Sequence, residues 1–320
     1  MVFNVIYIIS IIVFISSSSC KSQANNNVHS PVELLNEAQV IAFSEVHNMS
    51  SDDHYILSVL DSDEFVEKIN DIAIEAANSS YQQLLDEYLI GLKKINKEEL
   101  KIIWKNSSQL GVAESPFYER LIEKVRDINS RKSHQERIRM IAGDHPINWE
   151  EIKSFEVYKK YLNRDTHYAN VVIEESLKKG RNSLLIAGGD HFLRNESTIT
   201  SLIEKSGFKM QVIRPIDATL FDYIKPFIKV EIISSNSPKL IKVDEFFSNI
   251  GEDVLYLQSL EFGSKTPIRN KRFTDHIDFL VFIDEPNLLD TTPTFPEAKG
   301  RDLDIIKERA SRLGMQMIEH

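Results

Sequence analysis

Four short apolar runs in this chain each end at an acidic residue or a histidine. The ends are Ser44-Glu45-Val46-His47 after residues 39–43, Glu75 after 71–74, Gly143-Asp144-His145 after 137–142, and Gly188-Gly189-Asp190-His191 after 183–187. Apolar runs of this length, bounded by turn residues, are typical of buried strands in a parallel sheet. Ligands bind such sheets in the crevice at the carboxyl ends of the strands. The pattern therefore predicts a site rich in titratable groups at one edge of a sheet.

The segments between these runs have helical spacing, which predicts an α/β fold. We expect a central, mainly parallel sheet flanked by helices, with Glu75 beside the first strand. A helical insertion over residues 79–128 follows the second strand. A C-terminal α/β extension follows residue 213, with strands near 227–233, 254–258 and 279–283 and a helix near 303–313. Residues 279–283 are expected to join the main sheet as an edge strand.

The first twenty residues have the pattern of an export signal. Residues 2–15 are apolar except for Asn4 and Ser10, and a serine run leads to Cys20, the only cysteine. The length matches the hydrophobic region of a signal peptide and is short for a membrane span. A lone cysteine at this place resembles a bacterial lipoprotein signal, in which that cysteine is lipidated. Two departures are the absence of Lys or Arg before the apolar run and serines where the usual motif has an aliphatic residue. An ordinary signal peptide or an uncleaved anchor is the alternative.

The N-terminal pattern gives a domain plan and a location. We expect a signal over residues 1–20, a tether over 21–29, and a single domain over 30–320. The protein would be attached to the bacterial cell envelope through lipid on Cys20, on either its periplasmic or its outer surface.

The composition limits the classes of molecule that are expected to bind this protein. The chain of 320 residues has a net charge of −10 and shows no basic stripe, which excludes nucleic acid as a partner because phosphates need cations to neutralise them. A small molecule is the expected partner. The sequence has no Gly-x-Ser-x-Gly nucleophile elbow, no His-Glu-x-x-His zinc helix and no glycine-rich phosphate loop.

Glu45 and His47 are the first pair that could carry chemistry. Positions two apart on a strand face the same side, so both could point into one pocket. A glutamate beside a histidine fixes the imidazole tautomer, which suits a general base or a metal ligand. The alternative is a pair that caps the following helix.

The later strand ends add further candidates. Glu75 ends an apolar strand, where a carboxylate must be paired or solvated; a salt bridge to Arg164 is the structural alternative. His191, with Asp190 beside it, follows a glycine pair that allows close approach of a ligand. Arg164, at the start of a helix, could reach an anionic intermediate, hold Glu75, or be a surface arginine. Asp144 and His145 belong either to the site or to an ordinary turn before Pro146.

These motifs resemble a superfamily that joins the erythromycin esterases, the TIKI/TraB-type proteins and the ChaN-type haem-binding lipoproteins. Its pattern is a first strand ending Gly-Glu-x-His, a second ending in Glu, and a late strand ending in a Gly-x-x-His or Gly-Gly-x-His turn. Residues 44–47, Glu75 and residues 188–191 match, with Ser44 in place of the glycine. The segment from Arg164 to Ala169 resembles an Arg-Asp-x-x-Met-Ala segment, with Tyr168 in place of Met. The likeness is closest in layout to ChaN-type members and covers residues 38–215.

The resemblance implies a site formed by Glu45, His47, Glu75 and His191. We expect a cell-envelope hydrolase in which the Glu/His cluster and Arg164 activate water on an ester or amide bond. The alternative is a non-catalytic haem-binding lipoprotein of iron uptake. A divalent metal held by His47, His191 and Glu75, haem, and a metal-independent mechanism all remain open, as do the substrate and the oligomeric state.

Overall fold

The computed structural model describes residues 28–45, 50–109, 116–216, 238–247, 275–282 and 301–315. The predicted signal with Cys20, most of the tether, His47, and the predicted strands 227–233 and 254–258 lie outside these ranges. Val28 and His29, at the end of the predicted tether, pair with Ile241 and Leu240 in an antiparallel ladder.

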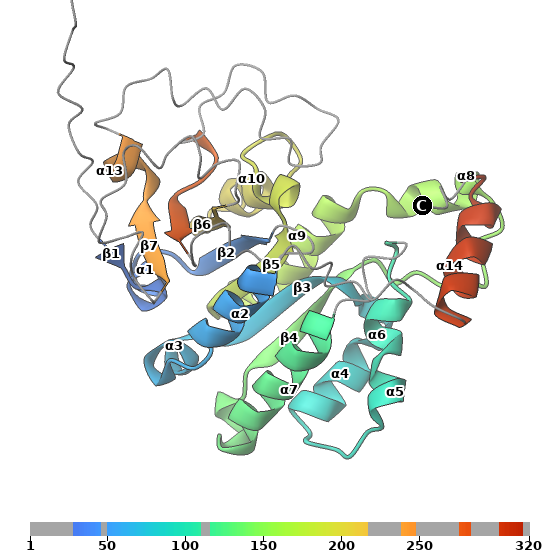
Figure 1. Ribbon diagram of the computed structural model, residues 1–320, viewed down its shortest axis with the longest axis horizontal. Coiled ribbons are helices and arrows are strands. Elements are labelled where there is room, and N and C mark those ends of the chain that lie inside the picture. Colours follow the sequence, from blue (N-terminus) through green and yellow to red (C-terminus); the bar gives the residue numbers. More distant parts are fainter. Residues whose placement is uncertain are drawn as a thin grey trace, which may run out of the picture.

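The described strands form one eight-stranded sheet in the order β1-β7-β8-β6-β2-β5-β3-β4 (Figure 1). Every neighbouring pair from β8 to β4 is parallel, and β1 and β7 are antiparallel to their neighbours. This confirms an α/β fold with a mainly parallel sheet. The strands are β1 (Val28–His29), β2 (Val40–Glu45), β3 (Asp71–Asn78), β4 (Arg139–Asp144), β5 (Ser183–Gly188), β6 (Met210–Pro215), β7 (Lys239–Lys242) and β8 (Phe279–Phe282).

Two predictions about the strand order are wrong. The strand that carries Glu75 does not lie beside β2, because β5 is inserted between them and pairs with both. β8 is not an edge strand, since it pairs with β6 on one side and β7 on the other. Both differences come from pairings between residues far apart in sequence, which a local hydrophobic pattern does not encode.

Helices cover both faces of the sheet. They are α1 (Pro31–Glu37), α2 (Ser50–Val59), α3 (Asp63–Lys68), α4 (Gln82–Leu89), α5 (Lys97–Leu100), α6 (Ile102–Lys105), α7 (Pro116–Ser130), α8 (Phe155–Tyr158), α9 (Arg164–Glu175), α10 (Ile199–Lys205), α13 (Val243–Phe247) and α14 (Arg301–Arg312). The predicted helical insertion is α4 to α7, between β3 and β4. None of the helices in the described ranges is both long and apolar enough to cross a membrane.

Local signals account for several helix ends. Ser30 and Glu33 form a capping box at the start of α1. The Glu33 carboxylate accepts a hydrogen bond from the backbone N–H of Ser30, and the Ser30 side chain accepts one from the backbone of the first turn. After α9, a 3-10 turn ends at Gly180, which has a φ of 71°, a left-handed conformation that costs glycine little.

Alternating residues of the strands supply two cores. In β2, Ile41 and Phe43 pack under α1 to α7, whereas Val40 and Ala42 pack under α9 and α10, as the two-residue period of a strand requires. A third, smaller cluster lies apart from the sheet and joins the segment around α8 to the end of α14: Ile147, Trp149, Ile152, Tyr158, Tyr161 and Leu313.

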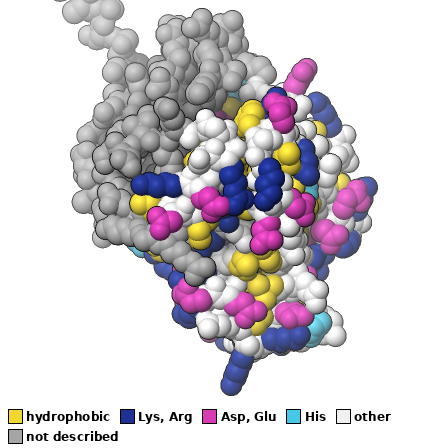
Figure 2. Space-filling view, turned by 90° about the vertical axis from the view of Figure 1, so that its right-hand side faces the viewer, with side chains coloured by type: hydrophobic (Ala, Val, Ile, Leu, Met, Phe, Trp, Pro, Cys, Tyr) yellow, Lys and Arg dark blue, Asp and Glu magenta, His cyan; other side chains and the backbone are white. Residues whose placement is uncertain are grey.

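The face that carries α8 and α14 has a mixed charge. Figure 2 shows acidic and basic side chains interspersed over the described part of this face, with apolar side chains between them. Over the described residues, this face presents no broad basic patch of the kind that binds a phosphate backbone.

Candidate active site

The carboxyl edge of four neighbouring strands brings the predicted residues together. Glu45 ends β2, the turn with His191 follows β5, Glu75 lies on β3, and Asp144 ends β4. Arg164 joins them from the first turn of α9. These five residues, which the sequence predicts to be close together, therefore lie at one edge of the sheet. The role of each side chain stays a prediction.

Glu75 is the centre of the cluster. Its Oε2 accepts a hydrogen bond from the backbone N–H of Gly188 at 3.0 Å and lies 3.2 Å from Nε2 of His191. Its Oε1 accepts from Nε2 of Gln109 at 2.7 Å and lies 3.5 Å from a terminal nitrogen of Arg164. The Arg164 pairing that the sequence offered as a structural alternative is therefore present, alongside contacts that connect Glu75 to β5 and its turn.

An irregularity in β3 aims Glu75 at this edge. The ladder between β3 and β4 is regular up to Ile74 and resumes with a shifted register at Asn78. The strand was predicted to end at Glu75 but continues to Asn78, and a bulge of this kind redirects side chains where pairing is interrupted.

His191 lies between two carboxylates. Its Nδ1 contacts Oδ1 of Asp165 in a short hydrogen bond, and its Nε2 faces Glu75. Burial alone would lower the pKa of His191, but the charge of Glu75 and the hydrogen bond and charge of Asp165 outweigh it, and the net shift is upward. A neutral imidazole has one N–H and could donate to only one of these partners. The arrangement therefore favours the imidazolium form, which is an acid rather than a base.

Asp144 is held by a loop and faces the arginine. Both the backbone N–H and the hydroxyl of Ser108 donate to its carboxylate, the hydroxyl at 2.6 Å. Nε of Arg164 lies 3.6 Å from Oδ1 of Asp144 and makes no closer hydrogen bond. Arg164 is thus held between two carboxylates by long contacts, which leaves its planar set of donors able to turn toward a substrate oxygen.

A second pair of acids lies on the β2 side of the cluster. Glu45 is buried opposite Gly188 in the ladder. Burial, followed by the negative charge of Glu45, raises the pKa of Asp53 to about 7, despite the ion pair of Asp53 with Arg120 at 2.8 Å. At neutral pH the carboxyl of Asp53 is therefore partly protonated, unlike that of an ordinary aspartate.

His145 belongs to a different group of rings. It stacks on His167 with centroids 4.3 Å apart and meets the edge of Tyr161 at 5.6 Å. Its Nε2 contacts the carbonyl of Asn163 at 3.2 Å. Burial lowers the pKa of both histidines, so both are neutral at pH 7. Asp190 is half-buried in the turn before His191.

The described residues do not fit the divalent metal that the sequence left open. No three His, Cys, Asp or Glu side chains among them are arranged to hold an ion. Both ring nitrogens of His191 are directed at carboxylates, so neither is presented as a ligand. His47, the other expected ligand, lies outside the described ranges.

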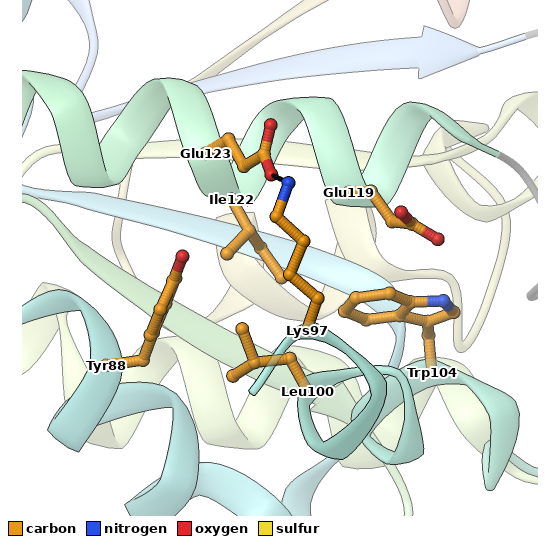
Figure 3. Close-up of a pocket in the computed structure, with 7 residues that line it drawn as sticks. All are labelled: Tyr88, Lys97, Leu100, Trp104, Glu119, Ile122 and Glu123. Carbon is orange, nitrogen blue, oxygen red and sulfur yellow. Dashed lines mark ion pairs between the residues drawn. The ribbon is translucent and has the colours of Figure 1, made fainter. Parts of the chain in front are cut away.

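A small cavity lies away from this edge, among α4, α5, α6 and α7 (Figure 3). It has about 250 Å³ of empty space, open solvent included, which is less than the usual range for ligand pockets. Lys97 extends across it to an ion pair with Glu123. It brings together none of the residues predicted for the site.

Sequence reasoning missed three residues that hold the cluster. No role was predicted for Asp165, although it stands next to Arg164 in the first turn of α9. Ser108 and Gln109 lie in a loop with no periodic pattern, where short polar residues are common. Of the three, only Asp165 had a signal in the sequence, which is its position in the segment that resembles the Arg-Asp-x-x-Met-Ala pattern.

Comparisons with known proteins agree with the fold at a low level of likeness. No protein-family model and no curated protein matches the chain. ChaN of Campylobacter jejuni, solved with cofacial haem, is 14% identical with a TM-score of 0.39, over 58% of this chain and 85% of its own. The type III effector HopBA1 is 14% identical with a TM-score of 0.41, over 71% and 95%. A protein of Bacillus cereus is 10% identical with a TM-score of 0.46, over 82% and 94%.

A ChaN protein, of the type that the sequence motifs resemble, is thus among the solved structures similar to this chain, at 14% identity.

Proposed function

We propose that the carboxyl edge is an acid–base site that hydrolyses an ester or amide bond. The observation that carries the proposal is His191, which is held between Asp165 and Glu75 so that both ring nitrogens face carboxylates. Such a histidine is an imidazolium whose orientation is fixed by two partners. This is the form needed to protonate a leaving group.

Other side chains at this edge are assigned to the remaining steps of the hydrolysis. Asp53, whose pKa of about 7 suits a general base at neutral pH, could remove a proton from the attacking water. Arg164, with only long contacts at 3.5 and 3.6 Å, supplies donors for the oxygen that becomes negative in the tetrahedral intermediate. His191 then donates its proton to the departing alcohol or amine. His47 as an additional base remains a prediction from the sequence.

The test is a screen of p-nitrophenyl esters and amides with wild-type protein, His191→Gln and His134→Gln. Glutamine keeps a hydrogen-bond donor but cannot act as an acid, so we expect turnover to fall roughly 100-fold or more in His191→Gln. His134 lies in the exposed 3-10 turn His134–Glu136, away from the site, and its variant should equal the wild type. Equal turnover in all three proteins would refute the role of His191.

Haem binding is a second candidate, and haem is what the ChaN structure contains. In this chain the observation in its favour is the half-buried ring group of His145, His167 and Tyr161. Burial keeps both imidazoles neutral, the form that binds iron, and imidazole and phenolate are both haem ligands in proteins. These rings are the residues that would hold haem.

A haem titration followed by absorbance separates the two candidates. Haem binding predicts a saturable Soret shift that is lost in a His145→Ala, His167→Ala double variant and kept in His191→Gln. The absence of a saturable shift would leave the hydrolytic proposal alone. Attachment to the cell envelope through lipid on Cys20 is a proposal for either function, and mass spectrometry of the membrane fraction would test it.

A further inference from the structure

The loop Asn106–Gln109 holds two carboxylates of the candidate site. Ser108 donates to Asp144 from both its backbone N–H and its hydroxyl, and Gln109 donates to Glu75 at 2.7 Å. Ser107 and Ser108 are fully buried. Any shift of this loop therefore moves hydrogen-bond donors relative to Asp144 and Glu75.

The loop follows α6 directly, since the backbone N–H groups of Asn106 and Ser107 donate to the carbonyls of Ile102 and Trp104 at 3.2 and 3.1 Å. Its own carbonyl groups are held by side chains of other elements. Trp149 donates from Nε1 to the carbonyl of Ser107 at 2.9 Å, and the Tyr158 hydroxyl donates to the carbonyl of Ser108 at 2.7 Å. Asn78 donates to the carbonyl of Asn106 at 2.8 Å. These three side chains satisfy carbonyl groups that no helix or strand partner satisfies.

α14 provides the contacts at the start of the loop. Arg309 donates from one terminal nitrogen to the carbonyl of Lys105 at 2.7 Å and from the other to Oδ1 of Asn106 at 2.5 Å. Its guanidinium also lies 4.8 Å from the ring centroid of Trp149. Arg312, one turn later, donates to the carbonyl of Trp149 at 2.7 Å.

These contacts matter because α14 is far from the loop in sequence and lies at one end of the molecule. Figure 1 shows α14 at the end of the molecule that carries α8, away from the sheet. It comes roughly 190 residues after the loop in sequence, and Leu313 anchors its end in the apolar cluster with Trp149 and Tyr158. Burial lowers the pKa of Arg309 to about 10, yet the guanidinium stays charged at neutral pH and keeps its donors.

We propose that Arg309 is a positioning residue, through which α14 fixes the loop Asn106–Gln109 and thereby the orientation of Glu75 and Asp144. This inference rests on the proposed function only where turnover is measured. A planar fork that spans a backbone carbonyl and a side-chain oxygen is specific to arginine. Lysine would retain the charge but reach one of the two acceptors.

The first test uses hydrogen exchange, which needs no activity. In Arg309→Met we expect the Ser108 amide, which donates to Asp144, to exchange at least about ten-fold faster, since its protection depends on the loop staying closed. Amides of β3 and β5 should be unchanged. Arg131→Met, which removes an exposed arginine paired only with Asp127, is the control. Unchanged exchange at Ser108 in a folded Arg309→Met protein would overturn the proposal.

The second test separates positioning from loss of the fold. Asn106→Ala removes the side-chain acceptor of Arg309, together with the hydrogen bond from Nδ2 of Asn106 to the Tyr81 hydroxyl, while leaving α14 intact. Its effect on exchange should overlap with that of Arg309→Met, so the two should not add in full. Arg309→Lys should lie between wild type and Arg309→Met. Additive effects would show that Arg309 acts by another route and would overturn the proposal.

Turnover distinguishes this inference from the proposed function. If hydrolysis is found, Arg309→Met should lower kcat roughly ten-fold or more, because a small displacement of catalytic groups has a large effect on rate, with a smaller change in KM. If no substrate is turned over but Ser108 exchange is accelerated, the proposed function fails and the positioning role stands. A normal kcat together with accelerated exchange would overturn the link to the site.

Discussion

Asp53 shows how placement changes the behaviour of a single residue. Its ordinary pKa is 3.8, and burial followed by the charge of Glu45 raises it to about 7 in the folded protein. Between these two values the folded state holds a proton that the unfolded chain has released. Arg120, whose ion pair with Asp53 works in the opposite direction, is half exposed and screened by solvent.

The pH dependence of stability follows with a definite sign. Because the folded state binds the extra proton, the contribution of Asp53 to the free energy of unfolding falls as pH rises from about 4 to about 7, with a slope of up to about 1.4 kcal/mol per pH unit. Below pH 4 both states are protonated, and above 7 both are ionised. Asp53→Asn should therefore gain stability relative to wild type across this window.

Urea denaturation at a series of pH values measures this difference. Asp127→Asn is the matched control, because that carboxylate is mostly exposed on the same helix as Arg120. Denaturation curves of Asp53→Asn and wild type that shift in parallel with pH would contradict the raised pKa. Taking the difference between variants removes the opposite trend from His145 and His167, whose lowered pKa values destabilise the folded state as pH falls below about 6.5.

At the scale of elements, the packing of β4 against α9 depends on one glycine and one tyrosine. A Cβ at Gly143 would overlap the ring of Tyr168 and come within 2.9 Å of the carbonyl oxygen of Ile74. The Tyr168 hydroxyl donates to the carbonyl of Ala73 at 2.8 Å, so the ring is fixed. Space alone therefore requires glycine at position 143, one residue before Asp144.

Gly143→Ala should destabilise the protein by roughly 3 kcal/mol, the upper part of the range for overpacked cores. Tyr168→Met replaces the rigid ring by a flexible side chain that can move away. The double variant should thus be less destabilised than the sum of the two single variants, as measured by thermal or urea unfolding. A sum that is simply additive would mean that the ring is not what excludes a side chain at Gly143.

The helices and strands also show which features of the fold could be predicted from the sequence and which could not. Strand ends at Glu45, Glu75 and His191 were predictable because each follows a buried run whose length and flanking residues are local signals. The capping box at Ser30 and the left-handed Gly180 were local as well. The insertion of β5 between β2 and β3 was not, since parallel pairing joins residues more than a hundred positions apart.

The length of one helix could not be predicted from the sequence for a related reason. Residues 149–162 belong to a segment between two of the apolar runs, where helical spacing predicts a helix, but only Phe155–Tyr158 is α-helical, followed by a 3-10 turn. Trp149 and Tyr158 are instead used in a separate apolar cluster and in hydrogen bonds to the loop that holds Asp144. Tertiary contacts of this kind override a weak local preference.

For the whole molecule, the two edges of the sheet carry different kinds of polar network. At the amino edge, Asp71 is fully buried and is bound by Arg181 through two contacts of 2.7 Å and by the hydroxyl of Ser176 at 2.5 Å. Each charge there is closely paired. At the carboxyl edge, Arg164 has only contacts of 3.5 Å and longer to carboxylates, and His191 is partly exposed. The first arrangement is typical of a structural network and the second of a site that can accept a ligand.

Asp71→Asn and His191→Gln test this division. Removing one partner of the buried pair should lower the free energy of unfolding by roughly 3 kcal/mol, while the turnover of the protein that remains folded is unchanged because no site residue is touched. His191→Gln should lower turnover but change the unfolding free energy by only about 1 kcal/mol, since glutamine keeps a hydrogen-bond donor and Glu75 retains its contacts with Gly188 and Gln109. Urea denaturation and turnover at a temperature where both variants are folded give the two numbers. If His191→Gln lost as much stability as Asp71→Asn, the carboxyl edge would be a structural network too, and the reason for placing chemistry there would disappear.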